Sequence, residues 1–145
     1  MKKGHRLLLL MALSIVVTTV KAQIGNTEKE IIQAMNKAAE AWNKGDLDSY
    51  LALYDTTATM MMPKGRAGLN AMRELYEKYY FENGSPRQLL AYDTYQFTPL
   101  GKEYALLTGR FILKANEKMK ERTGTFSLVF FRGPEGWKIF HDHSG

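Results

Sequence analysis

The sequence predicts a single α+β domain in which helices cover one face of an antiparallel sheet. Two observations lead to this class. Apolar side chains recur at helical spacing in the first half of the chain, whereas β-branched and aromatic runs separated by turn-rich segments fill the second half. A length of 145 residues suits one compact domain and disfavours two.

The N-terminal segment is predicted to be a secretory signal peptide, residues 1–22. A cationic start is followed by an uncharged apolar run over 7–20, which is shorter than the roughly 18 residues needed to span a bilayer. Small side chains before Gln23 offer a cleavage site, which would leave a mature, secreted or periplasmic domain of residues 23–145. The alternative is an N-terminal membrane anchor that is never removed.

Charge and cysteine content exclude several function classes. The formal net charge is +5, but the leader carries four basic residues and no acidic one, so 16 basic and 15 acidic residues remain in the mature chain. This balance argues against a nucleic-acid partner. The absence of cysteine excludes disulfides, thiolate metal sites, a cysteine nucleophile and a lipoprotein anchor. No cofactor and no membrane partner are predicted for the mature chain.

Two helices are predicted at the start of the mature chain. Residues 27–30 fit a capping box, which places the start of the first helix at Thr27. Gly45 supplies its left-handed stop, and Asp46 can cap the second helix directly. The apolar stripes of the two helices are Ile31, Met35, Ala38 and Trp42, then Leu47, Tyr50, Leu51 and Tyr54.

A strand and a third helix are predicted next. Residues 57–62 are β-branched and apolar and end before Pro63, which is typical of a strand. A helix is expected from about Leu69 to Glu82, where Asn83-Gly84 ends it. The Asn83-Gly84-Ser85 sequon is interpreted as this turn rather than as a glycan site.

The remainder predicts an antiparallel meander of four strands. Turn-rich segments at 99–101, 115–118 and 133–136 separate the strand-like runs. These runs are 87–98, 103–114, 120–132 and 136–143.

Four motifs resemble the nuclear transport factor 2-like superfamily, which includes SnoaL-like cyclases and ketosteroid isomerase. They are Trp42–Asp48, Leu53–Asp55, Met62–Gly65 and Gly136–Ser144. The last is similar to the branch that contains the calcium/calmodulin-dependent kinase II association domain and many exported bacterial proteins. The resemblance implies a cystatin-like fold: a cone-shaped, curved antiparallel sheet wrapped around N-terminal helices, with a pocket at its open end. It also implies a homodimer formed through the outer sheet face.

The ketosteroid isomerase mechanism is rejected from the residues themselves. That reaction needs an aspartate base where this chain has Met62, and a tyrosine proton donor where it has Ala38. Signatures of other hydrolases, nucleotide-binding proteins and metalloproteases are missing from the sequence. Whether the protein is an enzyme stays open.

Alternation along the last strand places His141 and His143 on the same face as Trp137 and Ile139. This pattern predicts a strand that runs from the core to the mouth of a pocket. Three interpretations remain. The histidines are solvated and have no special role, or their imidazoles bind a small molecule, or they are two ligands of a metal site whose third ligand cannot be identified from the sequence. No metal site is predicted.

Two arginines are further candidates for ligand binding. Arg110 lies within an apolar run, where a guanidinium needs a partner. It is expected either to hold an anionic ligand in the pocket or to form an ion pair, for instance with Asp93 or Glu103, or to lie on the dimer face. Arg122 shares a strand face with apolar residues and is expected at the pocket rim.

Trp42 and Tyr54 complete the predicted ligand-binding set, because the implied fold turns their faces toward the pocket. The alternative for both is an ordinary role in the core. Within 60–62, one or two methionines are expected to line the interior as a deformable apolar wall.

Three functional hypotheses follow. The first is an exported protein that binds a small apolar or anionic molecule. The second is a SnoaL-like isomerase, dehydratase or hydrolase that uses His141 or His143 as acid–base. The third is a dimeric scaffold that binds a partner protein.

Overall fold

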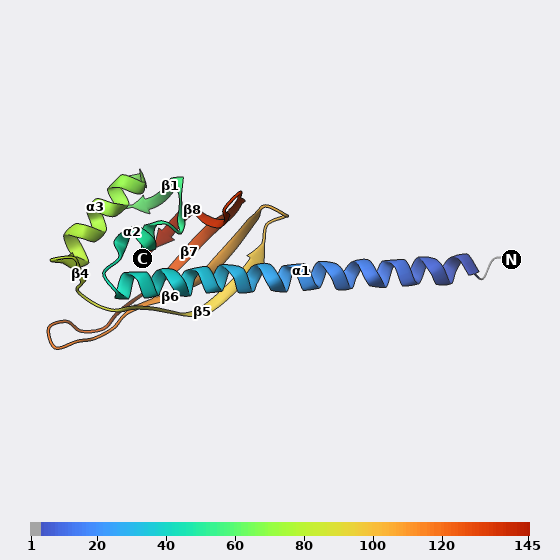
Figure 1. Cartoon of the computed structure of the whole chain (residues 1–145), viewed down its shortest axis with the longest axis horizontal. Helices are drawn as coiled ribbons and strands as arrows, with labels where there is room; N and C mark the ends of the chain where they lie inside the picture. The colour runs from blue at the N-terminus through green and yellow to red at the C-terminus, as the bar shows by residue number, and fades with distance from the viewer. Residues whose placement is uncertain (1–3) are drawn as a thin grey trace.

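The computed structural model describes the backbone of residues 4–145 and the side chains of residues 21–145. A long helix lies along one side of a curved sheet, and two shorter helices close one end (Figure 1). The predicted leader, residues 1–22, falls largely outside the described side chains and stays a prediction. Among the described residues, no helix has both the length and the apolar character to cross a membrane.

The element order confirms the α+β class, with helices first and a meander last. The helices are α1 (Gly4–Asn43), α2 (Leu47–Leu51) and α3 (Leu69–Tyr79). The strands are β1 (Tyr54–Met62), β2 (Gly65–Gly68), β3 (Phe81–Glu82), β4 (Ser85–Pro86), β5 (Leu90–Pro99), β6 (Tyr104–Leu113), β7 (Arg122–Gly133) and β8 (Gly136–Ser144).

Six strands form the main sheet in the order β2-β1-β8-β7-β6-β5. The predicted meander over β5–β8 is confirmed, and each of its neighbouring pairs is antiparallel. The sheet differs from the expectation at β1, which pairs with β8 in parallel. The main-chain N–H of Ile139 donates to Leu53 O at 2.8 Å, so this pairing begins just before β1.

The first helix does not begin at the predicted capping box. Helix α1 runs without interruption from Gly4, and Thr27 lies in its interior. The prediction was wrong because residues 22–26 contain no proline and can continue a helix, so a capping sequence is not required to act as a start. Among the described side chains of α1, Ile31 is the first that is buried, and none of the residues 21–30 is buried. The N-terminal part of α1 extends beyond the sheet (Figure 1).

The elements between α2 and the meander also differ from the prediction, and the meander strands differ by one to three residues at their ends. β1 starts already at Tyr54, which was assigned to the second helix. β2 was not predicted; it pairs with β1 across the turn at Pro63. α3 ends at Tyr79, since the segment after it turns at Asn83-Gly84, both with positive φ, to form the β3–β4 hairpin.

Strand β8 contains a bulge that the simple alternation did not anticipate. Ile139 pairs with Phe130, but His141 pairs with Val129, so Phe140 is an extra residue between them. Beyond the bulge the strand faces are exchanged: Asp142 is buried and His143 is exposed. The prediction that His141 and His143 share the face of Trp137 and Ile139 was therefore wrong.

The hydrophobic core lies between the concave face of the sheet, α1 and α3. The stripe predicted on the first helix is confirmed as its core face, because Ile31, Met35, Ala38 and Trp42 are all buried. The largest fully buried side chains are Phe130, Ile31, Met35, Met72, Leu107 and Ile139. The core thus joins the first helix to the central strands and frames the space described below.

Gly45 ends α1 as predicted, and it does so at a crowded point. Its φ is +81°, and its N–H donates to Trp42 O at 2.9 Å. A Cβ added here would collide with the main-chain oxygen of Gly84, in the hairpin turn. The helix end and the β3–β4 hairpin can approach this closely only with glycine.

Gly45→Ala is expected to lower the free energy of unfolding by about 3 kcal/mol, the combined cost of a left-handed alanine and of the clash. Gly101→Ala is the matched control: its φ is +87° but open space surrounds it, so about 1 kcal/mol is expected. Urea unfolding of both variants measures the difference. If the two variants lose the same amount of unfolding free energy, the close approach of Gly45 to Gly84 does not contribute to stability.

Candidate functional site

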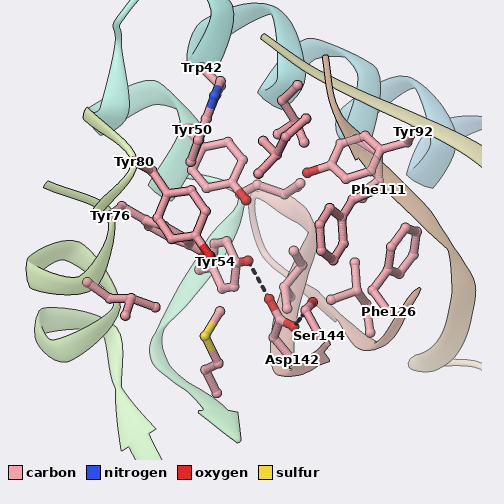
Figure 2. Close-up of a pocket in the computed structure, with 18 of the residues that line it drawn as sticks. Trp42, Tyr50, Tyr54, Tyr76, Tyr80, Tyr92, Phe111, Phe126, Asp142 and Ser144 are labelled. Atoms are coloured by element: carbon pink, nitrogen blue, oxygen red, sulfur yellow. Dashed lines mark hydrogen bonds between the residues drawn. The ribbon is translucent and has the colours of Figure 1, made fainter. Parts of the chain in front are cut away.

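A cavity of about 280 Å³ lies between the helices and the concave face of the sheet. Aromatic side chains from seven elements and the segment after α3 surround it, and a carboxylate lies at its base (Figure 2). Its aromatic lining residues are Trp42, Tyr50, Tyr54, Tyr76, Tyr80, Tyr92, Phe111 and Phe126. The volume is near the lower end of the range for small-molecule sites.

Trp42 is fixed at the helix side of the cavity. Its ring makes edge-to-face contacts with Tyr50, Tyr76 and Phe81, at centroid distances of 5.0, 5.4 and 4.8 Å. Its Nε1–H donates to Gln88 O at 3.1 Å. The buried Gln88 amide in turn donates to three main-chain oxygens around the start of β7 and the end of β6. Trp42 is thus a rigid wall whose polar atom is already satisfied.

Asp142 forms the base of the cavity. The bulge in β8 turns it inward, between Leu128 on β7 and Met60 on β1, and only 2% of its surface is exposed. The Tyr54 hydroxyl donates to one carboxylate oxygen at 2.7 Å, and the Ser144 hydroxyl donates to the other at 2.6 Å. Both contacts are visible as dashed lines in Figure 2.

The electrostatics of the cavity follow from the burial of this carboxylate. Burial raises the pKa of Asp142 above its ordinary value of 3.8, while the donors Ser144 and Tyr54 oppose the shift. Burial, followed by the nearby charge of Asp142, also raises the pKa of Tyr54 well above its ordinary range. The phenols are therefore neutral hydrogen-bonding groups at physiological pH.

Three of the residues predicted to bind a ligand line this cavity: Trp42, Tyr54 and Arg122. Arg122 begins β7, and its guanidinium lies over the Tyr80 ring, 5.8 Å from the centroid. This side chain is exposed, which agrees with the expected place at the rim.

Arg110 lies outside the cavity and forms an ion pair with Asp93, one of the alternatives that the sequence left open. Its Nε–H donates to Asp93 Oδ1 at 2.8 Å, and both side chains are partly exposed. The apolar run around Arg110 reflects the inward face of β6, because Leu107 is in the core and Phe111 and Leu113 line the cavity, whereas Arg110 points to the opposite face. The proposed carboxylate fork at this residue is not supported by its position.

His141 and His143 also lie outside the cavity, because of the bulge at Phe140. The His141 ring lies with its Nδ1 2.8 Å from the Thr59 hydroxyl, and His143 is exposed. Among the described side chains, no group of three histidine or acidic residues is placed to hold a metal ion.

The residues that the sequence did not single out are Asp142 and the phenols of Tyr50, Tyr76 and Tyr92. Uninterrupted alternation places Asp142 on the face opposite Trp137 and Ile139, and nothing in the flanking His-Asp-His-Ser sequence signals that the faces exchange. The prediction that one or two of these methionines line the interior is confirmed: Met60 is buried and lines the cavity, Met62 is partly buried against the core, and Met61 is 42% exposed.

Comparison with known families decides the relationship. The sequence model of the calcium/calmodulin-dependent protein kinase II association domain matches residues 27–145. The chain belongs to this association-domain family. No curated protein matches the chain.

Solved structures agree with this assignment and with the nuclear transport factor 2-like fold. A nuclear transport factor 2-like protein of unknown function from Shewanella oneidensis is 27% identical, covers 81% of this chain and 97% of its own, and has a TM-score of 0.69. The association domain of the C. elegans kinase is 16% identical, covers 85% and 98%, and has a TM-score of 0.70. A superfamily protein from Salmonella enterica is 22% identical, covers 83% and 91%, and has a TM-score of 0.65.

The raised pKa of Asp142 gives a stability prediction for this association domain. A folded-state pKa above the unfolded value means that the native state favours the protonated carboxyl. The stability that this group contributes is fully present below about pH 3.9, the pKa of an unperturbed aspartate, and is lost as the pH rises through the pKa of the folded state. Asp142→Asn is therefore expected to raise the free energy of unfolding at pH 7, and the gain should vanish near pH 4.

Asp55→Asn is the control, with the opposite sign. Asp55 is near the surface, and the Thr57 hydroxyl and N–H hold its pKa below the ordinary value. Its contribution is present above the unfolded pKa and is lost on acidification, so this variant should lose stability at pH 7 and match the wild type at low pH. Thermal unfolding across pH 3–7 measures both. A pH-independent effect of Asp142→Asn would contradict the prediction.

Proposed function

We propose that this protein binds a small molecule in the aromatic cavity. The observation that carries the proposal is a space of about 280 Å³ whose walls are aromatic and aliphatic and whose buried carboxylate is held in place by two hydrogen bonds. An apolar cavity of about 150 Å³ suffices for benzene, so a one-ring molecule with a short side chain fits. The contacts of Trp42 and Gln88 pre-form this space without a ligand.

The enzyme hypothesis in its predicted form finds less support. It assigned acid–base chemistry to His141 or His143, and both side chains lie outside the cavity. A cavity reaction would have to use Asp142 instead, because it is the buried carboxylate among the described lining residues. Binding requires no such step.

Trp42 can report binding directly. The chain has two tryptophans, and Trp137 does not line the cavity. Its buried Nε1 has no hydrogen-bond partner among the described residues, so Trp137→Phe breaks no hydrogen bond. In this background, saturation with a small phenol such as p-cresol is expected to change the Trp42 emission.

Leu128→Phe should weaken that binding at least about tenfold, because Leu128 faces the cavity and a larger side chain fills it. Val129→Phe is the matched control on the opposite face of β7, with an expected change below about twofold. If Leu128→Phe leaves the response of Trp42 emission to p-cresol unchanged, the compound binds outside the cavity, and the proposal is contradicted.

We further propose that the protein is exported and pairs as a homodimer. Among the described side chains of α1, Ile31 is the first that is buried, so the described core does not depend on residues 21 and 22. The outer sheet face carries the exposed rings of Tyr104 and Phe140. The similar structures include domains named for association and, in S. rosetta, a hub.

Native mass spectrometry of the full chain expressed into a periplasm tests both statements. We expect a dimer whose subunits begin at Gln23. Subunits that retain Met1 would overturn export with cleavage at this point, and a monomer at micromolar concentration would overturn the dimer.

A further inference from the structure

Asp142 forms no ion pair within the cavity, and the neighbouring imidazoles of His141 and His143, which act on its carboxyl through their charge, lie outside the cavity. Ion pairs among the described side chains involve other residues, and none includes Asp142. The carboxylate is 2% exposed, so water supplies little of the missing compensation. A buried charge without an opposite charge is costly, and folded proteins usually pair it.

The two hydrogen bonds of Asp142 orient the carboxylate but do not neutralise it. Tyr54 and Ser144 each donate a hydroxyl proton, one to each oxygen. Each carboxylate oxygen has two lone-pair positions, so an acceptor site remains on each oxygen. A ligand that reaches the base of the cavity therefore meets a fixed, partly satisfied anion.

The walls favour the same kind of ligand. The faces of aromatic rings carry negative electrostatic potential and attract cations within about 6 Å of the ring centre. Rings of Tyr50, Tyr92 and Phe126 surround the space above Asp142, and the hydroxyls of Tyr50 and Tyr92 point into it (Figure 2). These hydroxyls can accept a hydrogen bond from an N–H donor.

Arg122 and Asp142 do not form an ion pair, although both line the cavity. Asp142 pairs with Leu128, which is six residues, or about 20 Å of extended main chain, along β7 from Arg122. Arg122 is exposed and therefore screened by water. With Arg110 paired to Asp93 outside the cavity, the earlier case for an anionic ligand depends on this rim residue alone.

We propose that the cavity selects an organic ammonium ion, whose charged head pairs with Asp142 while an apolar or one-ring body fills the aromatic space. This inference rests on the proposed binding function and names its ligand class. A primary ammonium group has three donors, which match the free acceptor positions of Asp142 and the hydroxyls above it. Charge complementarity with a desolvated carboxylate then discriminates against neutral and anionic ligands of the same shape.

Three probes of similar size and different charge test the proposal: 2-phenylethylammonium, 2-phenylethanol and 3-phenylpropanoate. Binding to the full chain is measured at pH 7 by calorimetry and by Trp42 emission in the Trp137→Phe background. We expect the ammonium ion to bind at least about tenfold more tightly than the alcohol, and the carboxylate to bind most weakly.

Two variants separate the charge of Asp142 from its shape. Asp142→Asn keeps the side-chain volume and should reduce the preference for the ammonium ion over the alcohol to less than about twofold. Asp55→Asn changes the net charge equally at the surface and should leave the preference intact. Ser144→Ala keeps the carboxylate and should retain the preference, which guards against a folding defect in a single variant.

The outcomes distinguish the inference from the binding function. If the alcohol or the carboxylate binds the wild type as tightly as the ammonium ion, the ligand class is wrong and the binding function stands. If the ammonium preference survives in Asp142→Asn, the inference is also overturned, because the charge would be recognised elsewhere. If no probe binds, both the ligand class and binding of one-ring molecules are overturned.

Discussion

One extra residue in β8 controls the chemistry of this molecule. Phe140 interrupts the pairing between β7 and β8, and every side chain beyond it changes face. Asp142 and Ser144 enter the cavity as a result, whereas His141 and His143 turn outward. A strand without this bulge would line the base of the same cavity with imidazoles and would place the carboxylate in water.

The position of Asp142 carries an energetic conflict that the surrounding side chains reduce but do not remove. Burial disfavours the ionised carboxyl, and the hydroxyls of Tyr54 and Ser144 favour it. Such opposed effects are common at functional sites, where a perturbed group is held for binding or chemistry rather than for stability. The rigid contacts of Trp42 around the same space are consistent with a site prepared before its ligand arrives.

The chain belongs to the association-domain family and has the nuclear transport factor 2-like fold. Family and fold define the scaffold but do not determine what the cavity binds. Ala38 and Met62, the positions that the sequence resemblance aligns with the catalytic residues of ketosteroid isomerase, carry no ionisable group. The polar group that the cavity offers comes instead from the end of β8. The function of this chain therefore has to be argued from Asp142 and the phenols around it.

The sequence by itself determined the fold class, the four-strand meander, the core stripe on α1 and the stop at Gly45, because each depends on local periodicity or on one residue's backbone freedom. It also anticipated the Arg110–Asp93 pair. Only the tertiary structure decided that α1 continues through Thr27, that Phe140 is a bulge and that Asp142 is buried. The bulge and the burial of Asp142 depend on how β8 pairs with β7 and β1, and local patterns carry no information about where a register shifts. The continuation of α1 depends on the helix extending past a sequence that could equally begin one.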